Sequence, residues 1–249
     1  MTALTLTLRA APARDIDVSG LAPERIAGLD PGALGALRLP GGDEVADLFE
    51  IAPGDARHIV FRGATARLTH IGAGMRTGDI TVEGDCGARA GQGMRGGRLL
   101  ITGDAGDFVG GAPAGARQGM RGGLVAIHGN AGARVGERMR RGLILIGGNA
   151  GACCGSNMLA GTIYVAGNVG ALPGFALKRG TLLLGRAPQS LPVTFQDSGE
   201  HCLLFLTLLD KQLQREGADF ARFLPLAKKA RRYCGDLACG GTGEILVFT

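Results

Sequence analysis

Histidine and cysteine, the residues that most often carry out chemistry, are few in this chain and form no recognisable site. The four histidines are His58, His70, His128 and His201. Their spacing does not fit a metal site. Among the six cysteines, Cys234 and Cys239 lie five residues apart without a second pair, and the adjacent Cys153 and Cys154 interrupt an apolar pattern. The cysteines also lack the spacing of an iron–sulfur cluster. We therefore expect no catalytic residue and no metal ligand in this chain.

A glycine pattern at Gly91, Gly93 and Gly96 matches the letters of a dinucleotide-binding motif. That motif requires a strand before the glycines and a helix after them. Here a strand-like run, residues 98–102, follows the glycines, and the same glycines recur along the chain. The pattern therefore indicates an internal repeat and not a nucleotide site.

Cationic residues recur at one fixed place in that repeat. This place directly follows each residue of a regularly spaced methionine series that ends in Leu177. Five of the six residues there are cationic, and the six are Arg76, Arg95, Arg121, Arg140, Leu159 and Lys178. Stacked at strand spacing, about 4.8 Å, these like charges repel one another unless they are hydrated or neutralised. Guanidinium groups bind carboxylates in a two-pronged geometry that lysine cannot reproduce. We predict that Arg95, Arg121 and Arg140 contact a polyanionic ligand or an acidic partner surface. A hydrated corner of the fold is the alternative.

The repeat is about nineteen residues long. Its methionines advance in steps of 19, 26, 19 and 19 residues, and Leu177 follows after another 19. The single larger step contains a seven-residue insertion, 111–117. Each repeat has a strand-like run with two apolar positions on one face. The two columns that these positions form are Ile80, Leu99, Val125, Ile144, Ile163 and Leu182, and Val82, Ile101, Ile127, Ile146, Val165 and Leu184. Such stacked units bury a continuous core. We predict a mainly β fold, a right-handed parallel β-helix with six clear coils.

One corner of each coil carries an Asp/Asn-x-Gly triplet. The triplets begin at Asp85, Asp104, Asn130, Asn149 and Asn168. These residue types tolerate left-handed backbone and can bond the backbone of their own turn. A calcium ladder is the alternative. It is disfavoured because three of the five positions are neutral asparagine and no second carboxylate accompanies them.

The flanks of the repeat differ from it. Residues 1–60 do not repeat and are expected to form an N-terminal cap over an otherwise open strand edge. Residues 61–187 form the predicted β-helix. Residues 188–249 are predicted to be a linker followed by a helical arm, since leucines recur there at three- and four-residue steps. The outward-facing central position of the strands is mostly apolar, which predicts that either a partner or this arm covers it.

Composition narrows the function classes. The 249 residues carry a formal charge of +5 and only 4% aromatic residues, which argues against nucleic-acid binding. No run of eighteen apolar residues occurs, so we expect no membrane span. The amino terminus lacks the pattern of a signal peptide, which predicts a cytoplasmic protein with reduced thiols.

The repeats resemble a known family. The G-x-x-x-x-M-x-x-G coils, the Asp/Asn-x-Gly corners, the enlarged coil at 110–120 and the ending GDLACGGTGEIL at 235–246 resemble the C subunit of formylmethanofuran dehydrogenases. Within that family the arginine-rich composition is similar to the methylotroph version, the formyltransferase/hydrolase complex. The β-helix domain of glutamate synthase is a more distant resemblance.

The resemblance implies a non-catalytic scaffold subunit. Its partners would be a metal-dependent hydrolase, a formyltransferase and a chain related to the molybdenum or tungsten subunit. The complex would move a formyl group from tetrahydromethanopterin to methanofuran or methylofuran and release formate. The resemblance places the cofactor and the metals elsewhere in the complex and none in this chain. A scaffold of a molybdenum- or tungsten-dependent formylmethanofuran dehydrogenase and a glutamate synthase-type domain remain as alternatives.

Overall fold

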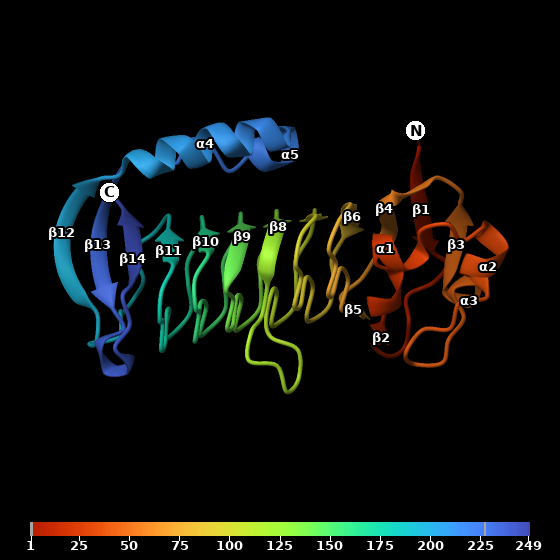
Figure 1. The fold of residues 1–249 in the computed structure, drawn as a ribbon, viewed down its shortest axis with the longest axis horizontal. Coiled ribbons are helices and arrows are strands. Elements are labelled where there is room, and N and C mark those ends of the chain that lie inside the picture. Colours follow the sequence, from red (N-terminus) through yellow and green to blue (C-terminus); the bar gives the residue numbers. More distant parts are fainter. Residues whose placement is uncertain (1, 227) are drawn as a thin grey trace.

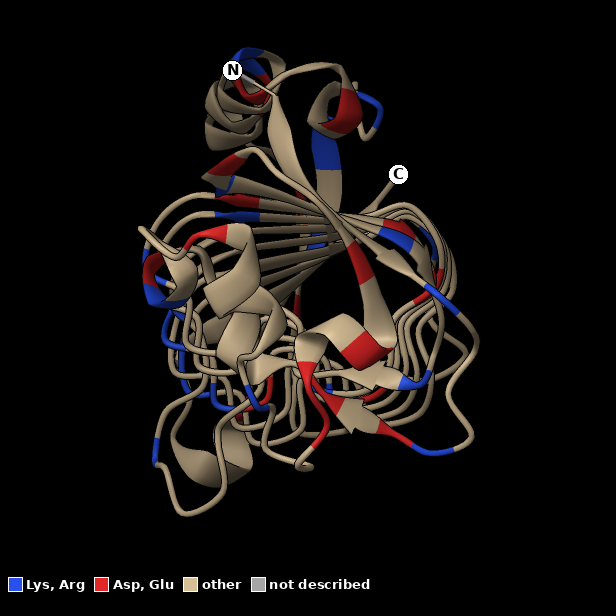
Figure 2. Cartoon of the chain, turned by 90° about the vertical axis from the view of Figure 1, so that its right-hand side faces the viewer, with Lys and Arg blue, Asp and Glu red and all other residues tan. Residues whose placement is uncertain are grey.

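The computed structural model describes residues 2–226 and 228–249 and is mainly β. A twelve-stranded, mostly parallel sheet runs along the whole molecule in the order β12-β13-β14-β11-β10-β9-β8-β7-β6-β4-β1-β3 (Figure 1). The strands of the repeat are β6 (Asp79–Gly84), β7 (Arg98–Ile101), β8 (Arg121–Ile127), β9 (Arg141–Ile146), β10 (Thr162–Val165) and β11 (Thr181–Leu184). Successive coils superpose when the stack is viewed along its length (Figure 2). This architecture is that of a β-helix-like solenoid.

The observed register confirms the predicted columns. Ile80 pairs with Leu99, Leu99 with Val125, and Val125 with Ile144, and the same alignment continues to Leu182. The parallel stack extends beyond the six strands of the repeat, because β4 (Asp55–Ala64) pairs with β6 and β14 (Gly243–Phe248) pairs with β11. The repeat therefore continues at both ends into segments whose sequences do not repeat.

The bore of the stack is filled by apolar side chains. The methionine column and Leu177 are fully buried, with relative exposures of 0% for Met75, Met94, Met120, Met139 and Met158. A third inward column is also buried, namely Ile71, Ala90, Val109, Val135, Cys154 and Pro173. Burial raises the pKa of the Cys154 thiol to about 12, so this cysteine packs as a neutral apolar group. The axis of the stack is therefore a packed core.

The Asp/Asn corner forms a ladder between coils. The Asn130 carboxamide oxygen accepts a hydrogen bond from the Asn149 amide at 2.9 Å, and the Asn149 oxygen accepts one from the Asn168 amide at 2.8 Å. Asp85 and Asp104 make the same bond to the following coil. These side chains therefore bond the next coil, whereas residue type alone predicts bonds within their own turn. The described residues also contain no carboxylate, histidine and cysteine cluster that could hold a metal ion.

The N-terminal segment closes one end of the stack. Strand β1 (Ala3–Leu8) pairs in parallel with β4 and antiparallel with β3 (Phe49–Ala52). The remaining elements here are β2 (Ile16–Asp17), β5 (Leu68–Thr69), a 3-10 turn (Ser19–Leu21), α1 (Pro23–Ile26), α2 (Pro31–Gly35) and α3 (Val45–Leu48). Strand β4 runs across the predicted boundary at residue 60. The antiparallel β3 ends the sheet in a short strand, which limits further edge pairing.

The C-terminal segment contains more strand than the sequence predicts. Besides α4 (Leu204–Glu216) and α5 (Ala218–Ala221), it forms β12 (Gln196–Cys202), β13 (Lys229–Gly235), β14 and a 3-10 turn (Leu237–Cys239). The basic residues at 228–232, within the segment predicted as a helical arm, lie largely in β13, which pairs antiparallel with β14. The helical prediction failed there because pairing with β14, a contact within the fold, outweighs local propensity.

The arm covers the outward apolar column. Leu206 and Leu213 of α4 and the following Phe220 and Phe223 pack in one buried cluster with the strand residues Leu100, Ala126, Leu145, Tyr164 and Leu183. Figure 1 shows α4 running along the sheet, over β8 to β11. His128 lies under the arm, with its Nε2 3.2 Å from the Asp219 carbonyl oxygen and its ring beside Phe223. The covering element is thus the chain's own arm. Among residues 2–226 and 228–249, no helix has the length and hydropathy that a membrane crossing requires.

Candidate functional site

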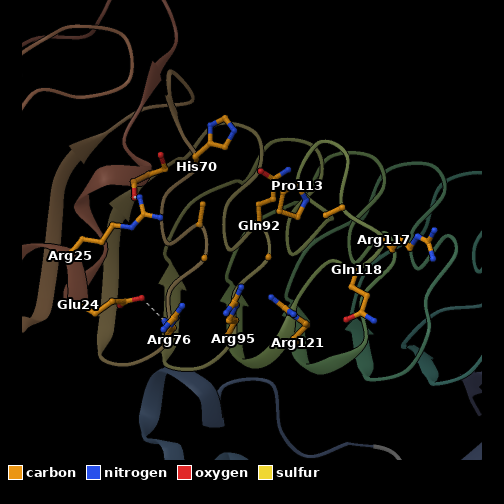
Figure 3. Close-up of a pocket in the computed structure, with 15 residues that line it drawn as sticks. Glu24, Arg25, His70, Arg76, Gln92, Arg95, Pro113, Arg117, Gln118 and Arg121 are labelled. Carbon is orange, nitrogen blue, oxygen red and sulfur yellow. Dashed lines mark hydrogen bonds between the residues drawn. The ribbon is translucent and has the colours of Figure 1, made fainter.

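An open groove of about 710 Å³ lies on the side of the stack where the coil corners carry arginine. Five arginines line it, Arg25, Arg76, Arg95, Arg117 and Arg121, and Glu24 is the one carboxylate among the described residues that line it (Figure 3). One wall comes from the N-terminal segment and the other from the seven-residue insertion. The groove therefore joins three parts of the sequence that are far apart.

The floor of the groove is the predicted arginine row. The amide of Arg95 donates to the Met75 carbonyl at 2.7 Å, and the amide of Arg121 donates to the Met94 carbonyl at 2.7 Å. These bonds hold equivalent residues of successive coils in line. Figure 3 shows Arg76, Arg95 and Arg121 side by side, one from each coil. The methionine before each of these arginines is fully buried, whereas Arg76, Arg95 and Arg121 are exposed.

The wall from the N-terminal segment is formed by α1. The Glu24 carboxylate accepts a hydrogen bond from the Arg76 amide at 2.9 Å, which fixes α1 against the first coil. Arg25 donates from its guanidinium to the Ser19 carbonyl at 3.0 Å. Pro23 begins this short helix, where the missing amide costs no hydrogen bond. The result is a rigid edge that presents one further cation to the groove.

The opposite wall is the insertion at 111–117. Gln92, which is 9% exposed, donates to the Ala112 carbonyl at 3.0 Å, and Arg138 donates to the Ala116 carbonyl at 3.3 Å. A Cβ at Gly93 would lie 3.0 Å from the Pro113 ring, so glycine at this position favours the close packing of the loop. The loop is therefore held at both ends by the coils before and after it.

His70 lies at the end of the groove nearest the N-terminal segment. Its ring nitrogen is 3.4 Å from the Asp17 carboxylate and 3.1 Å from the Thr69 hydroxyl. Burial lowers the pKa of His70; Asp17 acts in the opposite direction and Arg89 in the same direction. The imidazole is consequently neutral near pH 7 and adds no charge to the groove.

The electrostatics of the groove favour an anionic occupant. Within the described part of the chain, no carboxylate lies within 4.0 Å of a side-chain nitrogen of Arg25, Arg76, Arg95, Arg117 or Arg121. Several uncompensated guanidinium groups on one floor attract an oxyanion and present paired donors to it. Carboxylate and phosphate groups have the matching chemistry.

Two comparisons with known proteins lead to the same complex. No family model matches the chain. The C subunit of the formyltransferase/hydrolase complex Fhc of Methylorubrum extorquens is 39% identical over 88 residues, which span 34% of this chain and 33% of that protein. A chain in the crystal structure of the formyltransferase/hydrolase complex (FhcABCD) from Methylorubrum extorquens, solved in complex with methylofuran, superposes with a TM-score of 0.80. It is 37% identical and covers 98% of this chain and 99% of its own length.

The chain belongs to the family of the C subunit of the formyltransferase/hydrolase complex. Neither match supports the more distant relation to glutamate synthase. In this member of the family, the structure separates the three predicted site residues. Arg95 and Arg121 line the groove, whereas Arg140 lies one coil further along, outside its lining.

Sequence reasoning missed two arginines of the groove. Arg117 is the one charged residue of the insertion, and the position of the insertion in the repeat could have indicated that Arg117 lies near the arginine row. Arg25 gave no comparable signal, because nothing in the repeat predicts where α1 docks. The structure adds both to the groove of this family member.

Proposed function

We propose that the chain is a non-catalytic scaffold subunit of a cytoplasmic formyltransferase/hydrolase complex. The complex would transfer a formyl group from tetrahydromethanopterin to methanofuran or methylofuran and release formate. The observation that carries the proposal is the 37% identity to a chain of such a complex over 98% of this chain. Catalysis, cofactor chemistry and metals are assigned to the hydrolase, the formyltransferase and the chain related to the molybdenum or tungsten subunit.

The packing of the chain supports a scaffold role. The bore is filled by buried columns, both ends of the sheet finish in antiparallel strands, and the arm covers the outward apolar column. We propose a stack of six regular right-handed coils, with the division 1–60, 61–187 and 188–249 as the working description of its parts. A rod of this kind offers long outer edges at fixed positions for several partners.

The test is purification of the tagged chain from its native host. Hydrolase, formyltransferase and molybdenum/tungsten-subunit-like chains are expected to co-purify, and the eluate is expected to form formate from formyl-tetrahydromethanopterin. The chain expressed alone is expected to give no formate above a mock preparation. Turnover by the isolated chain would refute the non-catalytic role. Bound molybdenum or tungsten and iron–sulfur clusters in the purified complex would favour a formylmethanofuran dehydrogenase instead.

We further propose that the arginine row contacts either the acidic chain of a methanofuran-type cofactor or an acidic surface of a neighbouring subunit. Single exposed ion pairs contribute only ~0–1 kcal/mol, so the effect must come from several arginines together. The structure sharpens the expected roles, because Arg95 and Arg121 share the groove and Arg140 lies outside it.

The double variant Arg95→Gln/Arg121→Gln should therefore reduce complex assembly or bound cofactor, more strongly at low than at moderate salt, because salt screens the interaction that is removed. The matched control is the double variant Arg179→Gln/Arg186→Gln, which removes two exposed cations outside both the groove and the arginine row. Assembly and cofactor content are measured after size-exclusion chromatography. If the groove variant equals the control at both salt concentrations, the row is a hydrated corner.

A further inference from the structure

One column of residues in the stack adopts left-handed backbone without using glycine. The column has one member in each coil, with φ between 55° and 66°, and its members are His70, Arg89, Phe108, Arg134, Cys153 and Leu172. Left-handed backbone is strained for a residue with a side chain, and glycine removes that strain. The chain has 45 glycines, yet none stands in this column.

The coil geometry imposes this conformation. The amide of each of the first five members donates to a carbonyl of the next coil, as from Arg89 to Asp107 at 2.7 Å and from Phe108 to Ala133 at 2.9 Å. Two residues further along each coil, at Gly72, Gly91, Gly110, Gly136, Gly155 and Gly174, the left-handed position is always glycine. The stack thus requires left-handed backbone in both columns, but only in the second column does glycine relieve the strain. Side chains in the other column are retained despite the strain.

The side chains of this column form a continuous outer edge. The guanidinium carbons of Arg89 and Arg134 each lie 5.8 Å from the Phe108 ring centre, so two arginines flank one phenylalanine. Towards the C-terminal coils the edge becomes apolar, with Leu172 50% exposed and Phe175 49% exposed. Arginine and aromatic residues are enriched where proteins bind one another.

Stability of the isolated chain does not explain this edge. Cation–π contacts at exposed sites are weak, and an exposed Leu172 on left-handed backbone buries little apolar surface. We infer that this edge is an interface with another subunit, and this inference rests on the proposed role of the chain within a complex. The side chains kept in the strained column serve contacts that form only on assembly.

The chemistry of the edge specifies its partner. The two guanidinium groups lie beside the Phe108 ring, and their N–H groups can donate to carboxylate acceptors on a partner. Arg134 already donates to Glu137 at 3.2 Å, whereas no side-chain hydrogen bond of Arg89 occurs within the described residues. The partner surface therefore carries carboxylates opposite Arg89 and Arg134, and apolar side chains opposite Leu172 and Phe175.

The test uses glycine, because glycine removes a side chain of the column and fits its backbone. The triple variant Arg89→Gly/Phe108→Gly/Leu172→Gly is introduced into the tagged chain in the native host. Recovery of the co-purifying subunits on size exclusion is expected to fall about tenfold or more, the scale of lost interface hot spots. The melting temperature of the same variant, expressed alone, is expected to stay equal or rise.

The control is Ala176→Gly, since Ala176 is also left-handed (φ 55°) but its methyl group offers little to a partner. It should leave subunit recovery unchanged. Wild-type recovery in the triple variant would overturn the interface, and so would a fall in recovery together with a lower melting temperature. A wild-type chain that recovers no other subunit would instead refute the proposed complex and the interface with it.

Discussion

The inner face of the sheet and its outer face are both apolar, but they are covered in different ways. On the inner face each coil packs against the equivalent side chains of the coils on either side, as Met94, Met120 and Met139 do. On the outer face one helix, α4, together with Phe220 and Phe223, covers strand residues more than a hundred positions earlier in the chain, such as Leu100. The inner core is therefore distributed over the whole stack, whereas the outer core depends on one docked segment.

The two cores should therefore fail differently. A defect in the inner face interrupts a column shared by all coils, and in a solenoid each coil is stable only against its neighbours. A defect in the arm exposes one side of a stack that stays paired. Beyond its apolar contacts, the arm is tied down by Arg98, which binds Asp79 at 2.6 Å and approaches the Glu216 carboxylate at 3.4 Å. These ion pairs are partly exposed and therefore contribute only modestly to the stability of the docked arm.

The largest effect is expected from Met120→Asp. The substitution places an unpaired carboxylate in a fully buried column, at a cost of several kcal/mol. No soluble, cooperatively folding protein should be obtained. Met120→Leu is the matched control, because Leu177 fills the same column in the last coil and a volume-conserving change costs less than about 1.5 kcal/mol. Cooperative folding of Met120→Asp in urea would disprove the inner core described here.

A smaller and more local effect is expected from Leu206→Ala/Leu213→Ala. Both leucines are fully buried under the arm, and each truncation costs roughly 2–5 kcal/mol of packing. The arm should detach while the stack remains folded, which would give early proteolysis within 204–221 and binding of a hydrophobic dye. Leu204→Ala/Leu208→Ala is the control, since Leu204 is 85% and Leu208 68% exposed. Simultaneous loss of the arm and the stack in a single transition would show that the two cores are one cooperative unit.

The same contrast explains what could be predicted from the sequence. The columns and their register followed from the nineteen-residue period, because each coil places the same position in the same environment. The arm was identified from its leucine spacing and the apolar column from its position in the strands, but the sequence could not decide whether the arm or a partner covers that column. Strands β12 to β14 were missed because their pairing joins segments within a stretch that has no period, and Arg25 enters the groove only through the docking of α1.

The smallest predicted effect concerns pH and the arm alone. His128 on the strand side donates a hydrogen bond from Nε2 to the Asp219 carbonyl oxygen, and its pKa in the folded protein lies below the usual value of 6.5. Burial under the arm is the main cause of the lower pKa; Asp219 opposes it, and the nearby Arg222 adds to it. Between the folded pKa and 6.5, the unfolded chain binds more protons than the folded one, so stability rises with pH.

The contribution of His128 to the stability of the folded protein is therefore fully present above about pH 6.5 and decreases as the pH falls below this value. We expect the arm of the wild-type protein to detach at a lower urea concentration at pH 5.5 than at pH 7.5. His70 shifts in the same direction, so the comparison must be made against His128→Gln, which keeps His70 and removes only the group under the arm. The pH dependence of arm release should shrink in His128→Gln while that of stack unfolding stays the same. An unchanged pH dependence of arm release would mean that His128 titrates alike in the folded and unfolded chain, and that the arm does not bury it in solution.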